Sequence, residues 1–485
     1  MDKRISKIKI FLLFALLIYF AFLIFNAAVT IVFPYPVDYA EGISLDRVCK
    51  ISQWRWDGIY DDIAQYPYLS CQYNPVAWFL MAGLARVFGC SLALGRVFSF
   101  VTALLLAVLI GWLVKQSTKD GYVALIASLF YLASPYVYYQ AHVFGDIMSL
   151  GIIFSLLGIY LVSKYEGSNK IYLSLPLFIL AFYTKQPFVV APAAACLYLF
   201  FKDKRTALKF GGTYALLVLT IFLMANCLTS GNFYFHTIAG NRFAYNLVKM
   251  LFEYITTIQV HFVLLGFAAA FALNKLLKRE LDLFSFYFCL AALVAVGVGK
   301  AGASAISYML EPLAVACVLF SRSLVELQCR FKDYILARSL LVVLLILQLA
   351  ALAHAPYTAD STFRLSSTPT EDARLIGEKV SRYIQSTKGR VLSQDAGLVV
   401  INGKELLVDP ILVTQLSKGG MWDQTGLVTD IADGRFSLVL LKFDLEQTKS
   451  SGWFTDEMLS AIRNNYCLDE RIGENYLYKP KRGHR

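Results

Sequence analysis

The chain has 485 residues, of which 58% are hydrophobic and 16% charged, and it carries a formal net charge of +11 with a mean hydropathy of +0.57. This composition excludes a soluble single-domain protein and predicts a multi-pass membrane protein. The charge excess lies entirely before residue 357, because residues 357–485 hold 17 basic and 17 acidic side chains.

Apolar segments of roughly membrane-spanning length follow one another through residues 1–356. We expect about 11 spans. The first should be retained, because it is too long for a signal-peptide core and lacks a small-residue cleavage site. The predicted fold class is mainly α, a multi-pass membrane helical bundle over 1–356. The expected spans are 9–33, 92–114, 121–141, 144–163, 171–184, 187–201, 207–228, 255–274, 283–299, 302–321 and 335–355.

Basic residues gather on alternate connections between these segments. Nineteen of the 28 lysines and arginines before residue 357 fall on six connections that share one side of the membrane. The positive-inside rule therefore predicts a cytoplasmic N-terminus and an extracytoplasmic C-terminal domain, and we expect the protein to lie in the plasma (inner) membrane. Because the orientation in the membrane accounts for the positive charge, the charge does not indicate a nucleic-acid partner. We expect membrane lipids as partners and no nucleic acid.

The first outer loop, residues 34–91, is long and combines carboxylates with aromatic rings. A carboxylate within reach of an acceptor hydroxyl is a sufficient general base, and we take Asp38 as the first candidate and Glu41 as the second. The alternative is that both only cap the loop through hydrogen bonds. Cys49 and Cys71 lie in the same loop and form the candidate disulfide pair.

Further ionisable residues fall at the outer ends of later spans. His142 and Asp146 are four residues apart, on one helical face; Asp146 would support the base or orient the acceptor, and His142 would be its structural partner. Lys185 and Lys300 either neutralise a donor phosphate or snorkel to the interface. Glu311 follows Lys300 by 11 residues, about 16 Å along a helix, and needs a buried partner at that depth.

Residues 357–485 differ in pattern and predict a small α/β domain outside the membrane. Helical spacing covers 371–386 and 455–464, and the segments RVLS, LVVIN, ELLVD and FSLVLLKF are predicted strands. Asp395, Asp409 and Asp423 are interpreted as turn caps at strand ends. The cysteines and histidines show no metal-ligand spacing, and we find no phosphate-binding or hydrolase motif. We therefore expect no cofactor, and a divalent metal at the acidic loop has no support.

An ordered series of short motifs resembles the glycosyltransferase-C superfamily over roughly residues 10–320. Within it, the chain is most similar to the bacterial membrane glycosyltransferases grouped with dolichyl-phosphate-mannose:protein mannosyltransferases, aminoarabinose-lipid A transferases and Rhizobium lipopolysaccharide-core transferases. It departs from them where Asp38 and Glu41 are three residues apart instead of adjacent, and where Ser307 replaces an asparagine. The motifs are Tyr35-Pro36-Val37-Asp38-Tyr39-Ala40-Glu41-Gly42, Tyr73-Asn74-Pro75, Phe88-Gly89, Gly95-Arg96, Gly145-Asp146, Thr184-Lys185-Gln186, Gly299-Lys300-Ala301-Gly302 and Tyr308-Met309-Leu310-Glu311.

The resemblance implies an inverting transferase that moves a hexosyl or pentosyl unit from a polyprenyl-phosphate donor to a lipid, glycan or protein acceptor on the outer face. The implied catalytic residues are Asp38, Glu41 and Asp146. The implied substrate-binding residues are His142, Lys185, Lys300, Tyr308 and Glu311. The main alternative is a transporter or flippase of lipid-linked sugars, which should place ionisable groups near mid-membrane and often has repeated halves. A non-catalytic assembly protein with this fold is the third hypothesis.

Overall fold

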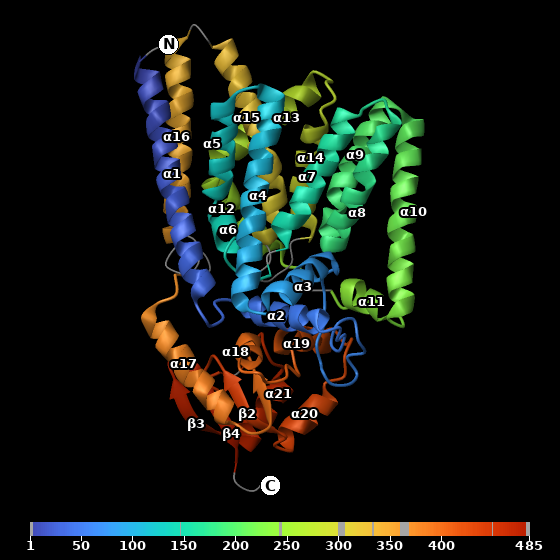
Figure 1. Ribbon diagram of the computed structural model, residues 1–485, viewed down its shortest axis with the longest axis vertical. Helices are drawn as coiled ribbons and strands as arrows, with labels where there is room; N and C mark the ends of the chain where they lie inside the picture. The colour runs from blue at the N-terminus through green and yellow to red at the C-terminus, as the bar shows by residue number, and fades with distance from the viewer. Residues whose placement is uncertain are drawn as a thin grey trace.

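Long helices stand side by side and form most of the molecule, with a smaller sheet-containing domain at one end (Figure 1). The computed structural model describes residues 3–145, 147–241, 245–298, 306–331, 334–358, 368–448 and 450–481. The N-terminus lies at the end of the bundle opposite the C-terminal domain, and α2 (Tyr39–Ser52) and α3 (Val76–Phe88) lie between the bundle and that domain (Figure 1). The predicted mainly helical fold is confirmed, and a small sheet is present in the C-terminal part of the chain.

The bundle is built from helices with strongly apolar sequences. Within the described residues, four are long and apolar enough to cross a membrane, namely Lys9–Val32, Leu92–Thr118, Lys204–Leu228 and Ser307–Arg330. The pair Met250–Val260 and Phe262–Leu277, bent by 96°, adds a fifth if it counts as one span, and six further apolar helices have 10–17 residues. The chain is therefore an integral membrane protein by composition and helix length, and the count of about 11 spans stays a prediction.

The helices follow the predicted segments, with breaks where proline or a polar cap interrupts them. The predicted span 121–141, for example, divides into α5 and α6 at Ser134-Pro135. The helices are α1 (Lys3–Val32), α4 (Leu92–Thr118), α5 (Gly121–Leu132), α6 (Pro135–Gln140), α7 (Met148–Lys164), α8 (Leu175–Thr184), α9 (Val190–Lys202), α10 (Lys204–Leu228), α11 (Asn232–Tyr234), α12 (Leu247–Val260), α13 (Phe262–Leu277), α14 (Leu283–Val298), α15 (Leu310–Arg330) and α16 (Ile335–Thr358). Short 3-10 or π turns are η1 (Asn169–Ser174), η2 (Gln186–Val189), η3 (Phe235–Ala239) and η4 (Ile306–Met309).

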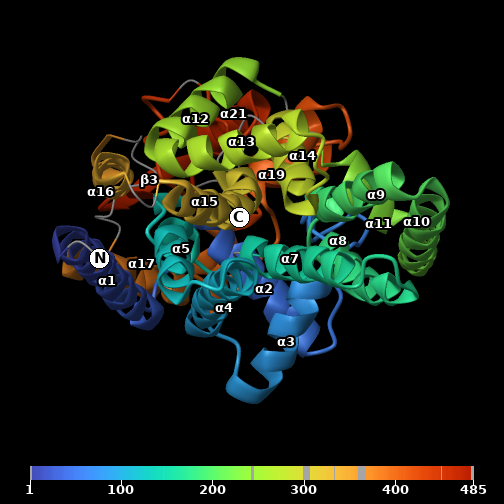
Figure 2. The ribbon, with the colours of Figure 1, turned by 90° about the horizontal axis from the view of Figure 1, so that it is seen from above.

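The core of the bundle forms around α15. In the end-on view this helix lies inside the ring of neighbouring helices (Figure 2), and 83% of its most apolar window is buried. Small side chains at Ala314, Ala316 and Cys317 are fully buried and let α4, α5 and α13 approach it closely. By contrast, only 6% of the corresponding window of α10 is buried, so its apolar surface is left for lipid.

The C-terminal domain contains a four-stranded sheet in the order β1-β2-β4-β3. Strands β1 (Arg390–Ser393) and β2 (Phe436–Leu441) pair in parallel, whereas β4 (Asn475–Pro480) is antiparallel to both β2 and β3 (Tyr466–Ile472). The helices are α17 (Glu371–Ser386), α18 (Ala396–Ile401), α19 (Pro410–Lys418), α20 (Thr425–Ala432) and α21 (Asp456–Asn465). The domain boundary near residue 357 stays a prediction.

The structure confirms the two predicted helices of this domain and corrects two of its predicted strands. The LVVIN segment forms α18 because the Asp395 side chain accepts from the Leu398 amide and starts a helix there. The ELLVD segment makes only one bridge, between Val408 and Tyr68 of the outer loop. The apolar pattern alone does not distinguish a short buried helix from a strand.

The outer loop contacts the C-terminal domain through α2 and through the segment around Tyr68. The Tyr68 amide donates to the Leu407 carbonyl at 2.7 Å, and the Asp409 amide donates to the Tyr68 carbonyl at 3.1 Å. On α2, a side chain at Gly42 would meet the Gly397 backbone at 2.0 Å, so only glycine permits this crossing of α2 and α18. The domain therefore covers the loop directly and completes the cavity described below.

The disulfide of the outer loop joins Cys49 to Cys90, and the predicted Cys49–Cys71 pairing is wrong. Cys90 follows the end of α3, and its Cα lies 5.6 Å from that of Cys49 near the end of α2. Cys71 is a free, fully buried thiol that packs in the core under the loop. The bond therefore ties the two interfacial helices together.

We expect non-reducing peptide mapping to recover Cys49 linked to Cys90. Cys90→Ser should lower the free energy of unfolding by about 2–4 kcal/mol, because the bond closes a loop with a sequence separation of 41. Cys71→Ser is the matched control and should leave the linkage unchanged. Recovery of a Cys49–Cys71 peptide would contradict this arrangement.

Candidate active site

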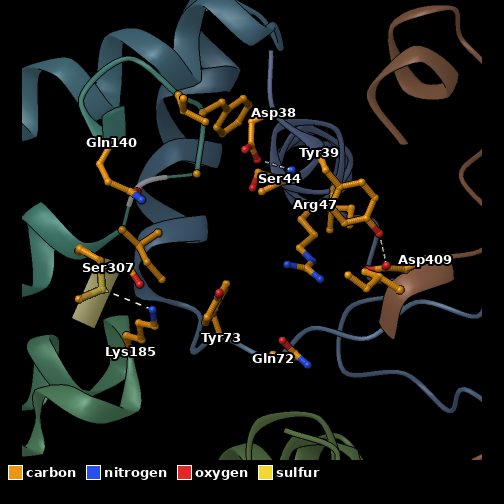
Figure 3. Close-up of a pocket in the computed structure, with 18 of the residues that line it drawn as sticks. Asp38, Tyr39, Ser44, Arg47, Gln72, Tyr73, Gln140, Lys185, Ser307 and Asp409 are labelled. Atoms are coloured by element: carbon orange, nitrogen blue, oxygen red, sulfur yellow. Dashed lines mark hydrogen bonds between the residues drawn. The ribbon is translucent and has the colours of Figure 1, made fainter. Parts of the chain in front are cut away.

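A cavity of about 250 Å³ lies where the bundle, the outer loop and the C-terminal domain meet (Figure 3). Its walls come from α2, the end of the outer loop, the turn between α6 and α7, the α8–η2 junction, η4 and the start of α19. The lining residues are Asp38, Tyr39, Ala40, Ile43, Ser44, Arg47, Gln72, Tyr73, Tyr139, Gln140, Val143, Phe144, Gly145, Ile147, Met148, Lys185, Ser307, Asp409, Ile411 and Leu412.

Asp38 lines this cavity as the N-cap of α2. One carboxylate oxygen accepts from the Ala40 amide at 2.8 Å, and the other accepts from the Tyr139 hydroxyl at 2.5 Å. These two bonds fix the carboxylate without an ion pair among the described residues. Asp38 is therefore held in one orientation and faces the cavity, as the geometry of a general base requires.

Glu41 occupies a different environment, and it does not line the cavity. Its carboxylate is fully buried and receives both Nε and Nη2 of Arg96, at 2.8 and 2.7 Å. Backbone amides of Val37 and Phe144 donate to the same carboxylate at 2.8 and 2.9 Å. With its oxygens engaged on every side, Glu41 holds the loop in place, and the geometry favours Asp38 as the base.

Lys185 reaches the cavity from the α8–η2 junction. Its ammonium lies 5.0 Å from the centre of the Tyr73 ring and 4.6 Å from that of Tyr308, and it donates to the Met148 sulfur at 3.4 Å (Figure 3). The side chain is buried, so it does not snorkel outward from the bundle. Ring faces attract a cation, so the two tyrosine rings help to hold the ammonium at the cavity. Tyr308 itself does not line the cavity but supports Lys185.

Arg47 is a second cation in the cavity, and our sequence analysis missed it. The side chain is buried, donates from Nη2 to the Ser70 carbonyl and lies 5.7 Å from the Trp78 ring centre. Figure 3 shows its guanidinium directed into the space between Tyr73 and Asp409. No pattern in the loop marked it, because a single arginine among acidic and aromatic residues has no periodic signal.

Asp409 is the second residue that the sequence analysis did not place in the site. It caps α19, lies fully buried, and accepts a hydrogen bond from the Tyr39 hydroxyl (Figure 3). Burial raises the pKa of this carboxyl to about 6, against the opposing effects of Tyr39 and Arg47. Burial of the ring, together with the same contact, raises the pKa of Tyr39 well above its usual value. Capping was predicted, but the position at a cavity wall was not.

The other predicted residues are dispersed. His142 is buried against the Tyr138 ring, with 5.2 Å between ring centres, and does not line the cavity. Glu311 is buried at the start of α15 and accepts from the Tyr287 hydroxyl at 2.7 Å, which supplies the predicted partner. Asp146 and Lys300 lie outside the described residues.

A resident metal is not indicated by the side chains that the structure describes. Within the described ranges, no group of three or more His, Cys, Asp and Glu side chains is placed to hold an ion. The expectation of no cofactor stays a prediction.

The comparisons bear out the resemblance seen in the sequence motifs at the level of the fold. The structure superimposes on ArnT from Cupriavidus metallidurans in the apo state with a TM-score of 0.63 at 11% identity, over 95% of this chain and 97% of that chain. ArnT bound to undecaprenyl phosphate gives 0.61 at 12%, over 96% and 98%. At these identities the likeness shows the fold alone.

Residues 72–229 match the family described as dolichyl-phosphate-mannose-protein mannosyltransferase. A third solved structure is also similar, the oligosaccharyltransferase AglB from Archaeoglobus fulgidus in complex with an inhibitory peptide and a dolichol-phosphate. It gives a TM-score of 0.52 at 11% identity, over 96% of this chain and 74% of that chain. No curated protein matches the sequence.

We expect Glu41→Gln to affect the free energy of unfolding more than it affects turnover. Removing the charge leaves Arg96 buried without its counter-ion, which should lower the free energy of unfolding by about 3–5 kcal/mol. Glu280→Gln is the matched control, because Glu280 is an exposed partner of Lys275 and its substitution should leave the thermal stability nearly unchanged. A Glu41→Gln protein with unchanged thermal stability and abolished turnover would instead identify Glu41 as the base.

Proposed function

We propose that the chain is a membrane glycosyltransferase that transfers a sugar from a polyprenyl-phosphate donor to a lipid, glycan or protein acceptor on the outer face of the membrane. The observation that carries the proposal is one cavity that combines a fixed carboxylate, Asp38, with two buried cations, Lys185 and Arg47. An acceptor needs a base, and a departing lipid phosphate needs positive charge; this cavity offers both.

In the proposed reaction, the acceptor oxygen attacks the anomeric carbon directly. Asp38 takes the acceptor proton as the new glycosidic bond forms. The bond between the anomeric carbon and the phosphate oxygen breaks, and its electron pair leaves with the polyprenyl phosphate. Direct attack from the face opposite the phosphate inverts the anomeric configuration. Tyr139 keeps the carboxylate aimed while the proton moves, because its hydroxyl donates to Asp38.

The leaving phosphate would be held by Lys185, with Arg47 as a second positive group. Both cations are buried, where a charge interaction is stronger than in water. Lys185 comes from the bundle, the side from which a membrane-embedded lipid would approach. The solved ArnT and AglB structures contain undecaprenyl phosphate and a dolichol-phosphate, respectively, and they share this fold.

The proposed orientation places the cavity outside the cytoplasm and the N-terminus inside. It is supported by the positive-inside pattern and by the position of the N-terminus at the opposite end of the bundle (Figure 1). The Cys49–Cys90 disulfide lies at the cavity end, which fits an oxidising compartment. The plasma (inner) membrane is the location that we propose.

A transporter or flippase of lipid-linked sugars is the alternative. One observation favours it, the burial of Glu311 within α15, since transporters place ionisable groups deep in the membrane. However, Glu311 is already paired with Tyr287, and the charged residues of the cavity gather at one end of the bundle. A non-catalytic assembly protein would need neither an aimed carboxylate nor buried cations.

The test is incubation of the purified full-length protein with undecaprenyl-phosphate-linked glucose, mannose, galactose, N-acetylglucosamine and arabinose, with alkyl glycosides as acceptors. Release of free undecaprenyl phosphate together with a glycosylated product supports a transferase. In liposomes, movement of an intact lipid-linked sugar without release would identify a flippase. Neither outcome with any donor would reject both functions for these lipids.

Asp38→Asn keeps the size and polarity of the side chain and removes its ability to accept a proton. We expect turnover to fall on the order of 10²–10⁴-fold, with donor binding nearly unchanged. Asp120→Asn is the matched control, because Asp120 also caps a helix, through the Tyr122 and Val123 amides, but lies outside the cavity. Equal, small effects of both substitutions would remove Asp38 from the chemistry.

Lys185→Met keeps an apolar stem and removes the charge. We expect the apparent KM for the lipid donor to rise about 10-fold or more, with acceptor KM unchanged, because the lost ammonium faces the donor phosphate. Lys202→Met removes an exposed lysine that pairs with Glu166 and should change neither constant. Unchanged donor kinetics with reduced protein yield would show that Lys185 serves the fold instead.

A further inference from the structure

The C-terminal domain contributes Asp409 to the cavity wall, and the capping of α19 does not account for both oxygens of its carboxylate. Resting on the proposed function, we propose that Asp409 is a specificity residue. Its Oδ2 accepts a hydrogen bond from a hydroxyl of a glycosyl unit bound in the cavity. The donor sugar and a sugar acceptor share this chemistry, and the experiment below distinguishes them.

Asp409 is held at the cavity from two sides. Its amide donates to the Tyr68 carbonyl of the outer loop, and its side chain accepts from the Tyr39 hydroxyl of α2. The Tyr39 ring is itself held by Trp453 of the C-terminal domain, with 4.6 Å between ring centres. Its position is therefore set by contacts between the domain and the loop, so the site exists only when the two are assembled.

The capping role of Asp409 occupies only one of its two oxygens. Oδ1 accepts from the Leu412 amide at 3.4 Å and from Tyr39. Oδ2 is buried and has no hydrogen-bond partner among the residues that the structure describes. A buried carboxylate oxygen without a donor is costly, and native structures rarely keep one without a reason. A substrate hydroxyl would supply the missing donor.

The surroundings make Asp409 suited to a neutral polar group. Burial favours the uncharged carboxyl and raises its pKa to about 6, and the residue forms no ion pair with any described residue. Arg47 is directed into the space beside it without forming an ion pair (Figure 3). Sugar hydroxyls donate to carboxylate oxygens without bringing a charge, so they fit this position.

The position of Asp409 also indicates which part of a substrate it meets. In Figure 3, Asp409 and Lys185 stand on opposite sides of the cavity, one from the C-terminal domain and the other from the bundle. A lipid phosphate at Lys185 would leave the Asp409 side for the parts of the substrates that are farthest from the lipid. Those parts are the hydroxyls of the transferred sugar or of a sugar acceptor.

The matched control for Asp409 is Asp395 of the same domain. Each aspartate caps a short helix through a similar bond, to the Leu412 amide at 3.4 Å and to the Leu398 amide at 3.3 Å, respectively. Asp395 does not line the cavity and pairs with Lys442. Asparagine is as good an N-cap as aspartate, so the two Asn variants should fold comparably. Only Asp409→Asn places an amide N–H where Oδ2 accepts.

The experiment is a substrate-and-variant cycle on the purified full-length protein. The best donor from the undecaprenyl-phosphate sugar panel is compared with its single-position deoxy analogues, and octyl glucoside acceptors are compared with theirs. We expect the wild type to lose about 10- to 100-fold in kcat/KM when one particular hydroxyl is missing, and Asp409→Asn to lose nothing further on that analogue. The Asp395→Asn protein should keep the wild-type discrimination.

The outcomes separate the inference from the function on which it rests. If the Asp409→Asn protein loses nothing further only on a deoxy donor, Asp409 binds the transferred sugar. If it loses nothing further only on a deoxy acceptor, Asp409 binds the acceptor. An active Asp409→Asn protein whose discrimination matches the wild type in both series would overturn the inference and leave the transferase intact. A wild type that releases no undecaprenyl phosphate from any donor would reject the transferase, and this inference with it.

Discussion

The buried ion pair between Glu41 and Arg96 is the interaction on which the site depends. Arg96 rises from α4 with no exposed surface and also donates to the carbonyls of Thr30, Phe33 and Tyr35, at 2.6–2.7 Å. One guanidinium therefore donates hydrogen bonds to backbone carbonyls at the end of α1 and the start of the outer loop, and to the Glu41 carboxylate in the first turn of α2. Two charges buried this deeply are stable only when every hydrogen bond is made, and here the loop backbone makes them.

The Glu41–Arg96 pair also determines where Asp38 and Tyr139 lie. Glu41 also receives the Phe144 amide, so the turn between α6 and α7 is held against α2. Tyr139 precedes that turn, and its hydroxyl meets Asp38 three residues before Glu41. Asp38, the base in our proposal, is thus positioned through contacts that depend on the Glu41–Arg96 pair. The C-terminal domain then covers the arrangement through Tyr68 and Asp409, which makes the cavity a joint product of membrane and extramembrane parts.

Much of this organisation follows from the sequence, and the reasons for the omissions are physical. Hydropathy and charge patterning identified the bundle, and the outer-face argument brought Asp38 and Lys185 to one cavity. The choice between Asp38 and Glu41 required the side-chain environment, because only packing shows that Arg96 occupies Glu41. The order of the motifs included Gly95-Arg96 but did not indicate its partner.

The missed residues depend on contacts that are distant in sequence. Asp409 has the local pattern of a helix cap, and only the docking of α19 against the outer loop places it in the cavity. Cys90 pairs with Cys49 because the ends of α2 and α3 converge, which the spacing of the cysteines does not reveal. Where short apolar segments such as 398–402 were predicted as strands, an aspartate cap and tertiary packing selected a helix.

The most direct measurement of the central claim is an experimental structure of the protein with undecaprenyl phosphate. The account predicts that the phosphate lies within hydrogen-bond distance of Lys185 Nζ, beside Tyr73, in the cavity that Asp38 faces. A phosphate bound beside Glu311 within the bundle, or at the end where α1 begins, with the Asp38 cavity left without lipid, would contradict it.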